Sequence, residues 1–540
     1  MSRKRLGAGL PPNGQQQAKR HPSEPLLGAT LYNASDLANV LDLDEEQLRG
    51  ISTTALLAGN GRLFAQDAAV AREDPAGTYA LSRPVPRLDY FISHAWRTAR
   101  WPKFLCLLFY FNFNVSLGAY ALGAYLAFWW AVIGFDSLPD VFIFPPTNLA
   151  FDASKIGSTW ICTLVSVLSL VVALLTAHWW RPKSCFLDVC CIDQMDVSNK
   201  AKGISSLGAL LDRSDRMVVV LDEHYMSRMW CIFELAAFAK RSSMARCDLV
   251  PLHMALQRAA LTVVVIVYPL ITAALTPIFN YLPKDAGMAL YLPLFAVTLA
   301  PPYALLLYAI NQGRGTTLAL RRLKDFKLDN VECYSASDRE AIVSLIARWF
   351  ADVSAIDDSM DEARRQAIGV HQFEQFIRRD VVAKLQETLG DNEVLPEFSL
   401  LFLLTIGGAW ALDMMTVPEF TLYFVIPHAV QNFTVYLVGG PIFGWGAARA
   451  ADATFHAQQK WNWPACPAYM FVGIPVMIFF FGLALLTTIF TNPYGFFVNS
   501  DTAIGEFTFP DDGLEPFGRA MLKLQIVSLI FGCILVLSKK

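Results

Sequence analysis

Charged residues are scarce in this chain. Asp, Glu, Lys and Arg make up 17% of its 540 residues, whereas soluble globular domains contain about a quarter. Hydrophobic residues make up 54%, and the net charge is −3. The deficit of charge predicts membrane-spanning segments, with a lipid bilayer as a partner. The lack of a basic excess argues against nucleic acid as a partner.

Metal-ligand patterns and a secretory signal are also missing. The ten cysteines are scattered, no Cys-x-x-Cys motif occurs, and Cys190 and Cys191 form an adjacent pair. We therefore predict no metal site and no bound cofactor. The first 21 residues are basic and polar without an apolar core, so we expect no secretory signal peptide.

Long apolar runs predict an α-helical transmembrane bundle of about eight spans, each needing ~20 residues. The first run, 104–135, is too long for one perpendicular span, and Asn112 and Asn114 would be costly at mid-bilayer. We therefore expect 104–113 to lie at the membrane interface and the first span at 115–135. The other spans are expected at 158–177, 259–280, 288–310, 400–412, 420–444, 464–490 and 521–537.

The distribution of Lys and Arg predicts the orientation of these spans. The loops 136–157, 281–287, 413–419 and 491–520 hold three basic residues in total, and the segments between them hold most of the others. Basic loops stay on the cytosolic side. We therefore expect a multi-pass protein with both termini in the cytosol, in a membrane that the sequence does not specify.

The segment 184–240 has the pattern of a parallel α/β layer. Residues 217–221 form a short apolar run between charged residues, which is typical of a strand buried on both faces. Cys231, Leu235 and Phe238 follow at i, i+4 and i+7, which predicts an amphipathic helix. Strand, loop, helix and strand alternate here as they do in α/β proteins.

Several motifs carry a resemblance to a known family. They are Phe91-Ile92-Ser93-His94, the strand end at 186–188, the apolar run 218–221 and the sequence YMSRMWCIFEL at 225–235. Together they resemble a Toll/interleukin-1 receptor (TIR) domain, with one extra residue before Trp230. The resemblance covers 89–97 and 184–252 well and 326–389 loosely. It implies an α/β flavodoxin-like parallel sheet on the cytosolic side, combined with the membrane bundle.

The first two predicted spans separate the two halves of this pattern. Two spans return the chain to the side that it left, so the strands around Phe91 and Phe186 can be neighbours in one sheet. The amino edge of the sheet then faces the bilayer. The carboxyl edge, where open α/β sheets bind ligands, faces the cytosol.

The predicted organisation follows from these motifs and spans. It comprises a disordered basic tail with a small N-terminal region (1–86), the first TIR-like strand and helix (87–103), a membrane hairpin (104–180), the TIR-like remainder (181–256), a second hairpin (257–311), a cytosolic segment (312–397) and four membrane helices (398–540). In the cytosolic segment, 326–333 suits a strand that would complete the domain. A capping box at 337–340 starts one helix, and a second helix is expected at 372–389. The alternative is a separate helical hairpin packed beside the domain.

The resemblance also implies candidate site residues. Some TIR domains cleave the bond between nicotinamide and ribose in NAD, and their catalytic glutamate maps onto Glu234. A carboxylate at this place would stabilise an oxocarbenium-like ribosyl cation. The predicted substrate-binding residues are Ser93, His94, Asp188, Asp193 and Trp230.

A structural alternative exists for the main candidates. Glu234 can instead pair with a base such as Arg228 or Lys240, and Ser93 can cap a turn. The loop at 189–201 has no aromatic residue to stack on a ring of NAD. These observations weaken the case for an enzyme.

Three functions remain open. The first is signalling or self-assembly through homotypic TIR–TIR contacts in a homo-oligomer. The second is NAD hydrolysis by the same domain, with NAD as substrate rather than cofactor. The third is a transporter or channel regulated by the domain, for which His428, Gln431 and Asn432 are the polar residues at membrane depth.

Overall fold

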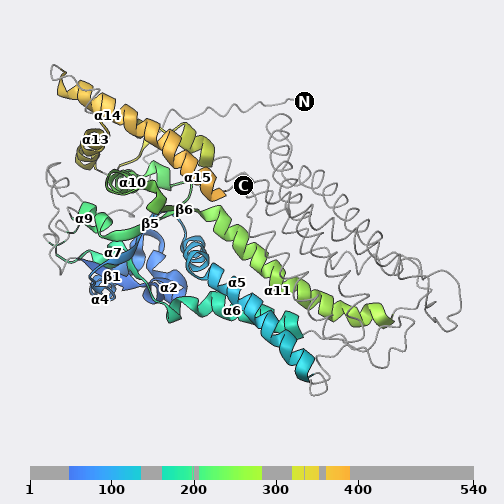
Figure 1. The fold of residues 1–540 in the computed structure, drawn as a ribbon. Coiled ribbons are helices and arrows are strands. Elements are labelled where there is room, and N and C mark those ends of the chain that lie inside the picture. The colour runs from blue at the N-terminus through green and yellow to red at the C-terminus, as the bar shows by residue number, and fades with distance from the viewer. Residues whose placement is uncertain are drawn as a thin grey trace, which may run out of the picture.

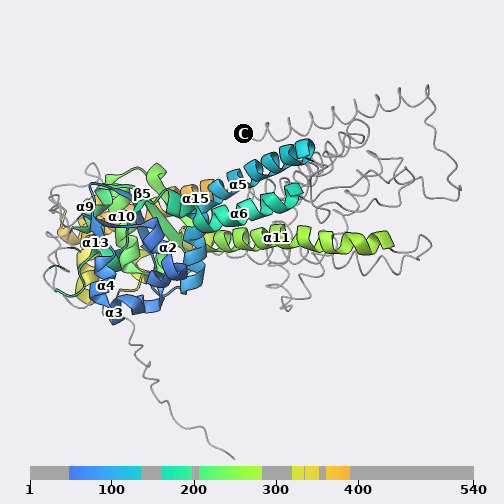
Figure 2. The ribbon, with the colours of Figure 1, turned by 90° about the horizontal axis from the view of Figure 1, so that it is seen from below.

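The computed structural model describes residues 48–134, 161–196, 199, 203, 206–281, 319–333, 335–351 and 360–389. These residues form a six-stranded sheet covered by helices, and three long helices project from it in one direction (Figures 1 and 2). The largest hydrophobic core joins the sheet, the N-terminal segment and the helices after residue 319.

The sheet has the strand order β2-β1-β4-β3-β5-β6. The strands are β1 (Arg49–Ser52), β2 (Arg83–Pro84), β3 (Leu88–His94), β4 (Ser184–Phe186), β5 (Ser214–Leu221) and β6 (Cys247–Pro251). The last four are parallel, and their spatial order is 2-1-3-4 in chain sequence, as in flavodoxin-like folds. β1 is antiparallel to both of its neighbours. The sheet is therefore mixed, and it fits the predicted α/β flavodoxin-like class.

β3 and β4 are neighbours although α5 (Arg100–Gly134) and α6 (Ile161–Trp180) lie between them in the chain. Phe91 and Phe186 are partners in the parallel register. Their rings stack with centroids 4.7 Å apart and planes inclined by 15°. The predicted pairing of these two strands is confirmed.

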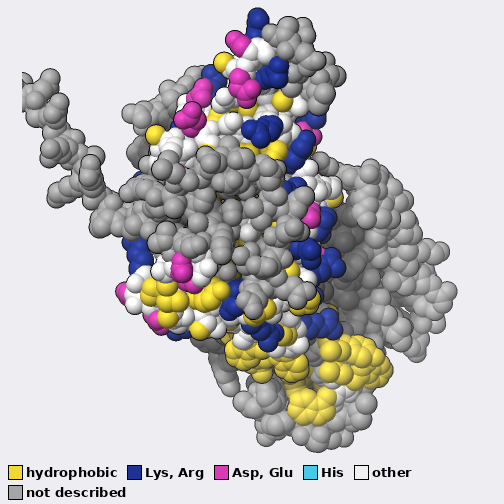
Figure 3. Space-filling model, turned by 90° about the vertical axis from the view of Figure 1, so that its left-hand side faces the viewer, with side chains coloured by type: hydrophobic (Ala, Val, Ile, Leu, Met, Phe, Trp, Pro, Cys, Tyr) yellow, Lys and Arg dark blue, Asp and Glu magenta, His cyan; other side chains and the backbone are white. Residues whose placement is uncertain are grey.

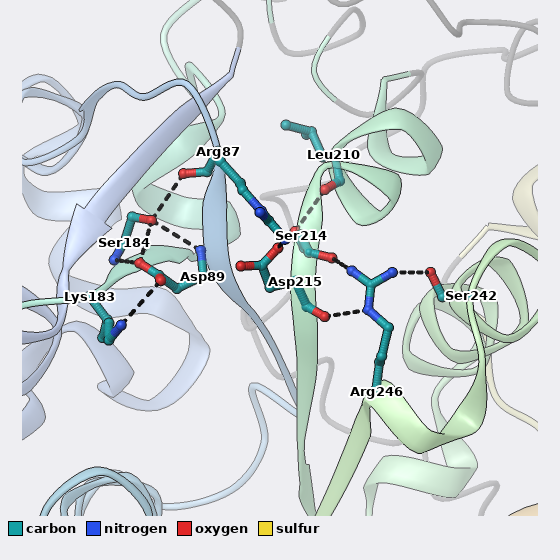
Figure 4. Close-up of polar contacts among 9 residues, drawn as sticks. All are labelled: Arg87, Asp89, Lys183, Ser184, Leu210, Ser214, Asp215, Ser242 and Arg246. Atoms are coloured by element: carbon teal, nitrogen blue, oxygen red, sulfur yellow. Dashed lines mark hydrogen bonds and ion pairs between the residues drawn. The ribbon is translucent and has the colours of Figure 1, made fainter.

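The amino edge of the sheet is held by polar contacts between strand starts (Figure 4). Lys183 pairs with Asp89, whose carboxylate also accepts a hydrogen bond from the Ser184 backbone N–H at 2.7 Å. Arg246 donates to the backbone carbonyls of Ser214 and Asp215, both at 2.6 Å. These contacts fasten the start of β3 to that of β4 and the start of β5 to that of β6.

α5 is one continuous helix that includes both the segment 104–113, predicted to lie at the membrane interface, and most of the span predicted at 115–135. The first turns of α5 bury Cys106, Leu107 and Phe109 in the main core. The predicted boundary at residue 104 therefore falls inside a helix that belongs to the sheet domain at one end and projects beyond it at the other.

Asn112 lies in the contact between α5 and α6. It is fully buried between α5 and α6, where its Nδ2 donates to the Leu174 carbonyl at 2.7 Å and lies 2.9 Å from His178 Nδ1. Asn114, two residues later, is exposed. A side-chain amide nitrogen that bonds to a neighbouring helix carries a smaller cost than one facing lipid.

α5 and α6 are each long and apolar enough to cross a membrane, over Arg100–Ala131 and Ile161–Trp180. α11 (Leu252–Tyr281) follows β6, and the described apolar stretch in it, Leu252–Val267, is shorter. The five spans predicted from residue 288 onward lie outside the described residues. Figure 3 shows a band of hydrophobic side chains beside the charged part of the surface. The exposed apolar residues of α5 and α6 include Leu122, Tyr125, Leu126, Trp129, Leu168, Val172 and Leu175.

Residues 48–86 are part of the sheet domain, which the sequence prediction for 1–86 did not anticipate. Between β1 and β2 the chain forms α2 (Thr53–Gly61), two 3₁₀ turns (Arg62–Phe64 and Gln66–Ala68), α3 (Ala69–Glu73) and α4 (Pro75–Ala80). Ser52 ends β1 and caps α2 by accepting a hydrogen bond from the Ala55 N–H. Leu56 and Phe64 are fully buried in the main core. This segment therefore extends the sheet beyond β4.

The TIR-like part contains α7 (Asp188–Cys191), α9 (Leu207–Asp212), the 3₁₀ turn η6 (Tyr225–Ser227) and α10 (Met229–Arg241). α7 falls at the start of the segment expected to be a loop, whereas α10 lies where the apolar spacing predicts a helix. α10 buries Cys231, Leu235 and Phe238, the three residues whose spacing indicated a helix.

The segment after residue 319 adds helices rather than a strand. The predicted strand at 326–333 is a 3₁₀ turn (Leu328–Asn330) followed by one parallel bridge between Glu332 and Arg228, so it is not a strand of the sheet. The side chain of Ser335, not Ser337, caps the next helix. The helices are α13 (Ala336–Phe350), α14 (Glu362–Phe376), a π-helical turn (Ile377–Val381) and α15 (Val382–Leu389). Trp349 of α13 meets Phe233 of α10 with ring centroids 5.6 Å apart, so these helices share the core of the sheet domain.

Candidate functional site

The candidate site lies at the carboxyl edge of the parallel strands. Ser93 and His94 end β3, Asp188 begins α7 directly after β4, and Asp222 follows β5. Glu234 lies in the second turn of α10. After β3 the chain continues to β4 on one side, and after β5 it continues to β6 on the other side. The point between the ends of β3 and β5 is therefore a topological switch point. The fold therefore gathers three acidic side chains where open α/β sheets bind their ligands.

Glu234 is linked to β3 by a short hydrogen bond. The Ser93 hydroxyl donates to Glu234 Oε2 at 2.5 Å and lies 2.7 Å from the Tyr225 hydroxyl. Ser93 and Tyr225 are fully buried, whereas Glu234 is partly exposed. The structure thus places the predicted catalytic residue between an enclosed polar pair and the surface of the carboxyl edge.

Burial raises the pKa of Glu234 to about 8. The hydrogen bond from Ser93 opposes this shift, and the nearby charge of Asp188 adds to it. The carboxyl is therefore mainly protonated at pH 7. It can donate a proton in that state, and it becomes a carboxylate only under mildly alkaline conditions or when a cation approaches.

Asp188 is held by the loop after β3. Trp96 Nε1 donates to Asp188 Oδ2 at 3.0 Å, and the Val189 backbone N–H donates to Oδ1 at 2.8 Å. Burial raises the pKa of Asp188, while the bond from Trp96 and the charge of Lys103 oppose the rise. Asp188 therefore connects the ends of β3 and β4.

Asp222 organises the turn that carries Tyr225. Its Oδ1 accepts hydrogen bonds from the backbone N–H groups of His224 at 3.0 Å and Tyr225 at 2.7 Å, and its Oδ2 accepts one from the Thr98 hydroxyl. Burial raises the pKa of Asp222, against these hydrogen bonds. An Asp at this position is typical of a side chain that caps a turn.

His94 is enclosed rather than offered to a ligand. Its ring meets Phe64 and Trp96 edge to face, with centroid distances of 5.2 and 4.4 Å. Within the described residues neither ring nitrogen has a hydrogen-bond partner. Burial, with the charge of Lys103, holds the pKa of His94 well below its usual value. The imidazole is therefore neutral, and its role in substrate binding stays a prediction.

Asp193 and Trp230 make no hydrogen bond to Glu234 among the described residues, although Trp230 lies one helical turn before Glu234 in α10. Asp193 accepts hydrogen bonds from the Met195 backbone N–H at 2.9 Å and Asn199 Nδ2 at 3.3 Å, within its own loop. Trp230 packs edge-on against Phe233, with ring centroids 5.7 Å apart. Their roles in substrate binding stay predictions.

The sequence reasoning missed several polar residues of this edge. They are Trp96, Thr98, Lys103, Asp222 and Tyr225. Asp222 was detectable in principle, because it follows a buried strand directly. Lys103 was not, because it lies at the start of an apolar helix and is fully buried, with its Nζ donating to the Ala95 carbonyl at 3.3 Å. Among the described residues no group of three His, Cys, Asp or Glu side chains is arranged to hold a metal ion.

The family comparison agrees with part of this architecture. The family described as TIR domain matches residues 171–260, so a TIR domain is found there. The match spans β4 to β6 and includes Glu234, whereas β3 lies outside it. No curated protein and no solved structure matches the chain.

Proposed function

We propose that the protein is a membrane-anchored TIR domain that signals on the cytosolic side by self-assembly. The observation that carries this proposal is the position of the TIR domain at one end of two apolar helices. α5 has 35 residues and is ~52 Å long, whereas the seven residues of β3 span ~23 Å. α5 begins near the carboxyl edge and runs back along the sheet, so its second half extends past the amino edge.

α6 supports the same arrangement. It ends at Trp180, four residues before β4 begins at Ser184, so it enters the sheet domain at the amino edge. A bilayer around α5 and α6 would leave the carboxyl edge and the loop after α7 facing the cytosol. Exposed Trp179 and Trp180, followed by Arg181, are typical of a membrane boundary on the cytosolic side.

The test of this proposal is the number of chains per assembly in a bilayer. Labelled full-length protein in supported bilayers, counted by stepwise photobleaching, should form oligomers. TIR domains commonly self-associate, and the loop after α7 faces the cytosol in this arrangement. Charge reversal at Asp193 and Asp196 in that loop should therefore lower the oligomer fraction. Glu387→Lys, an exposed acid on α15, is the matched control. Monomers at every surface density would contradict self-assembly.

NAD cleavage is a second candidate, and the geometry of Glu234 favours it. The reaction breaks the bond between the ribose C1′ and the nicotinamide nitrogen, and the electron pair leaves with nicotinamide. Water then captures the ribosyl cation and loses a proton, which gives ADP-ribose. A carboxyl group at a switch point, with one oxygen fixed by Ser93, suits stabilisation of that cation.

This candidate is tested by incubating the full-length protein in detergent or nanodiscs with NAD and measuring released nicotinamide. Glu234→Gln should abolish the release, and Glu387→Gln should not change it. Absence of release from the wild-type protein, in monomeric and assembled states alike, would leave signalling by contact alone. Transport gains no support from the described residues, because His428, Gln431 and Asn432 lie outside them.

A further inference from the structure

The sequence predicts Ser93 as a substrate-binding residue, yet its side chain faces the interior. Ser93 is 1% exposed, and its hydroxyl is engaged on both sides, by Glu234 Oε2 at 2.5 Å and by the Tyr225 hydroxyl at 2.7 Å. The Tyr225 hydroxyl also lies 3.3 Å from the Cys231 backbone carbonyl. Three side chains from β3, η6 and α10 therefore form one continuous hydrogen-bond chain that ends on a backbone acceptor.

The two oxygens of Glu234 have different surroundings. Oε2 is the end of the buried chain. Among the described residues none donates a hydrogen bond to Oε1, and the residue is partly exposed. One oxygen is thus fixed by the fold, and the other has no hydrogen-bond donor among the described residues.

The chain is satisfied in both protonation states of the carboxyl. When Glu234 is ionised, Ser93 donates to Oε2 and Tyr225 donates to Ser93. When Glu234 carries a proton on Oε2, the two bonds between side chains reverse, so that Glu234 donates to Ser93 and Ser93 donates to Tyr225. The Tyr225 hydroxyl is then free to donate to the Cys231 carbonyl. The carboxyl group therefore keeps its position while its charge changes.

We propose that Ser93 and Tyr225 are positioning residues for Glu234, which fix Oε2 inside the fold and present Oε1 to a ligand at the carboxyl edge. This inference deepens the proposed NAD cleavage and rests on it for the identity of the ligand. Neither residue touches the substrate. Both act through the carboxyl group, and each should stabilise the ionised form, because hydrogen bonds to a charged acceptor are stronger than neutral ones.

The test is the ionisation of Glu234 in the full-length protein without NAD. Infrared difference spectra recorded against pH follow the protonated carboxyl, and the band that disappears in Glu234→Gln belongs to this residue. Ser93→Ala should move the midpoint to higher pH by about one unit, since it removes the direct donor. Tyr225→Phe should move it in the same direction by less, since it removes the second link. Ser93→Thr, which keeps the hydroxyl in a strand, should stay near the wild type.

Ser214→Ala is the matched control. Ser214 is fully buried in β5, and its hydroxyl donates to the Leu210 carbonyl at 2.7 Å at the opposite edge (Figure 4). Its loss should leave the midpoint unchanged. The proposal is overturned if Ser93→Ala and Tyr225→Phe behave like Ser214→Ala or shift the midpoint downward. Should one of the two variants fail to fold, the sign of the other decides.

Activity separates this inference from the proposed function. Where NAD is cleaved, Ser93→Ala should lower kcat and leave KM unchanged, because Ser93 does not contact NAD. A wild-type protein that releases no nicotinamide refutes NAD cleavage, while the titration still decides the roles of Ser93 and Tyr225. If the wild-type protein cleaves NAD but the titration midpoint of Glu234 is unchanged in both variants, the positioning roles are refuted and NAD cleavage stands.

Discussion

Phe91 and Phe186 stack on one another in adjacent parallel strands, with ring centroids 4.7 Å apart. Both rings are fully buried. The contact joins the strand before the long helices to the strand after them, so it fastens the part of the sheet outside the family match to the part inside it.

Phe91→Ala should therefore destabilise the whole sheet domain. Removal of a fully buried phenylalanine typically costs about 3–5 kcal/mol, through lost burial and the cavity left behind. Thermal denaturation of the purified protein, followed by tryptophan fluorescence, measures the effect. Met195→Ala, at an exposed position, should change the free energy of unfolding by less than about 0.5 kcal/mol. Equal effects of the two substitutions would show that the stacked rings do not stabilise the sheet.

Gly369→Ala should force α13 and α14 apart. A Cβ at residue 369 would collide with the backbone carbonyl of Ala347, and neither helix backbone can yield as a side chain would. We expect a loss of about 1–3 kcal/mol or more in thermal stability. Gly118→Ala is the matched control, because a Cβ there meets nothing within 4 Å and alanine favours a helix. A neutral Gly369→Ala would mean that the two helices do not cross at this point.

Asn112→Leu should weaken the α5–α6 pair, because it removes the donor that the Leu174 carbonyl and His178 share. The expected cost is about 1–2 kcal/mol, the range of interhelical hydrogen bonds. Asn114→Leu, at the exposed position two residues on, should have little effect. Denaturant titration in detergent compares the two variants. An equal loss of stability in both variants would show that the hydrogen bonds of Asn112 do not stabilise the α5–α6 pair.

The contribution of Glu234 to the stability of the protein should fall as pH rises toward 8. The pKa of Glu234 is about 8 in the folded state against a usual 4.5, so between these values the folded chain holds a proton that the unfolded chain releases. The free energy of unfolding therefore decreases with pH across this window. Glu234→Gln has no such proton, and its stability relative to the wild type should rise between about pH 5 and about pH 8. A pH-independent difference in melting temperature would contradict the raised pKa.

The rate of NAD cleavage should increase as pH rises through about 8, because the carboxylate stabilises a cation better than the neutral acid does. Initial rates of nicotinamide release between about pH 6 and about pH 9 give the profile. A rate that declines across this range would indicate that the protonated form of Glu234 is the active one.

The sequence predicted those strands and helices whose buried residues follow the hydrophobic pattern of the segment itself. The apolar run of β5 and the helical spacing of α10 were sufficient, because each is buried on the faces that its residues predict. β1 was missed because its four residues, Arg49–Ser52, have no strand pattern and form a strand only by pairing with β4. The prediction of a strand at 326–333 was wrong, because these residues pack against α10 and α14 instead of extending the sheet.

The candidate site was predictable where chemistry coincides with a strand end, as for Ser93, Asp188 and the adjacent helix residue Glu234. It was not predictable where a polar side chain is buried by tertiary contacts. Tyr225 contacts Ser93, 132 residues earlier in the chain, and Lys103 bonds to Ala95, eight residues earlier. The local sequence pattern around either residue does not indicate these contacts. The same limit misled the reading of Asn112, whose partner lies on another helix.

α5 has one further consequence. It runs without interruption from just after the loop of Trp96 to Gly134, and Trp96 donates a hydrogen bond to Asp188. One helix therefore connects the acidic edge of the sheet with the far end of the projecting apolar helices.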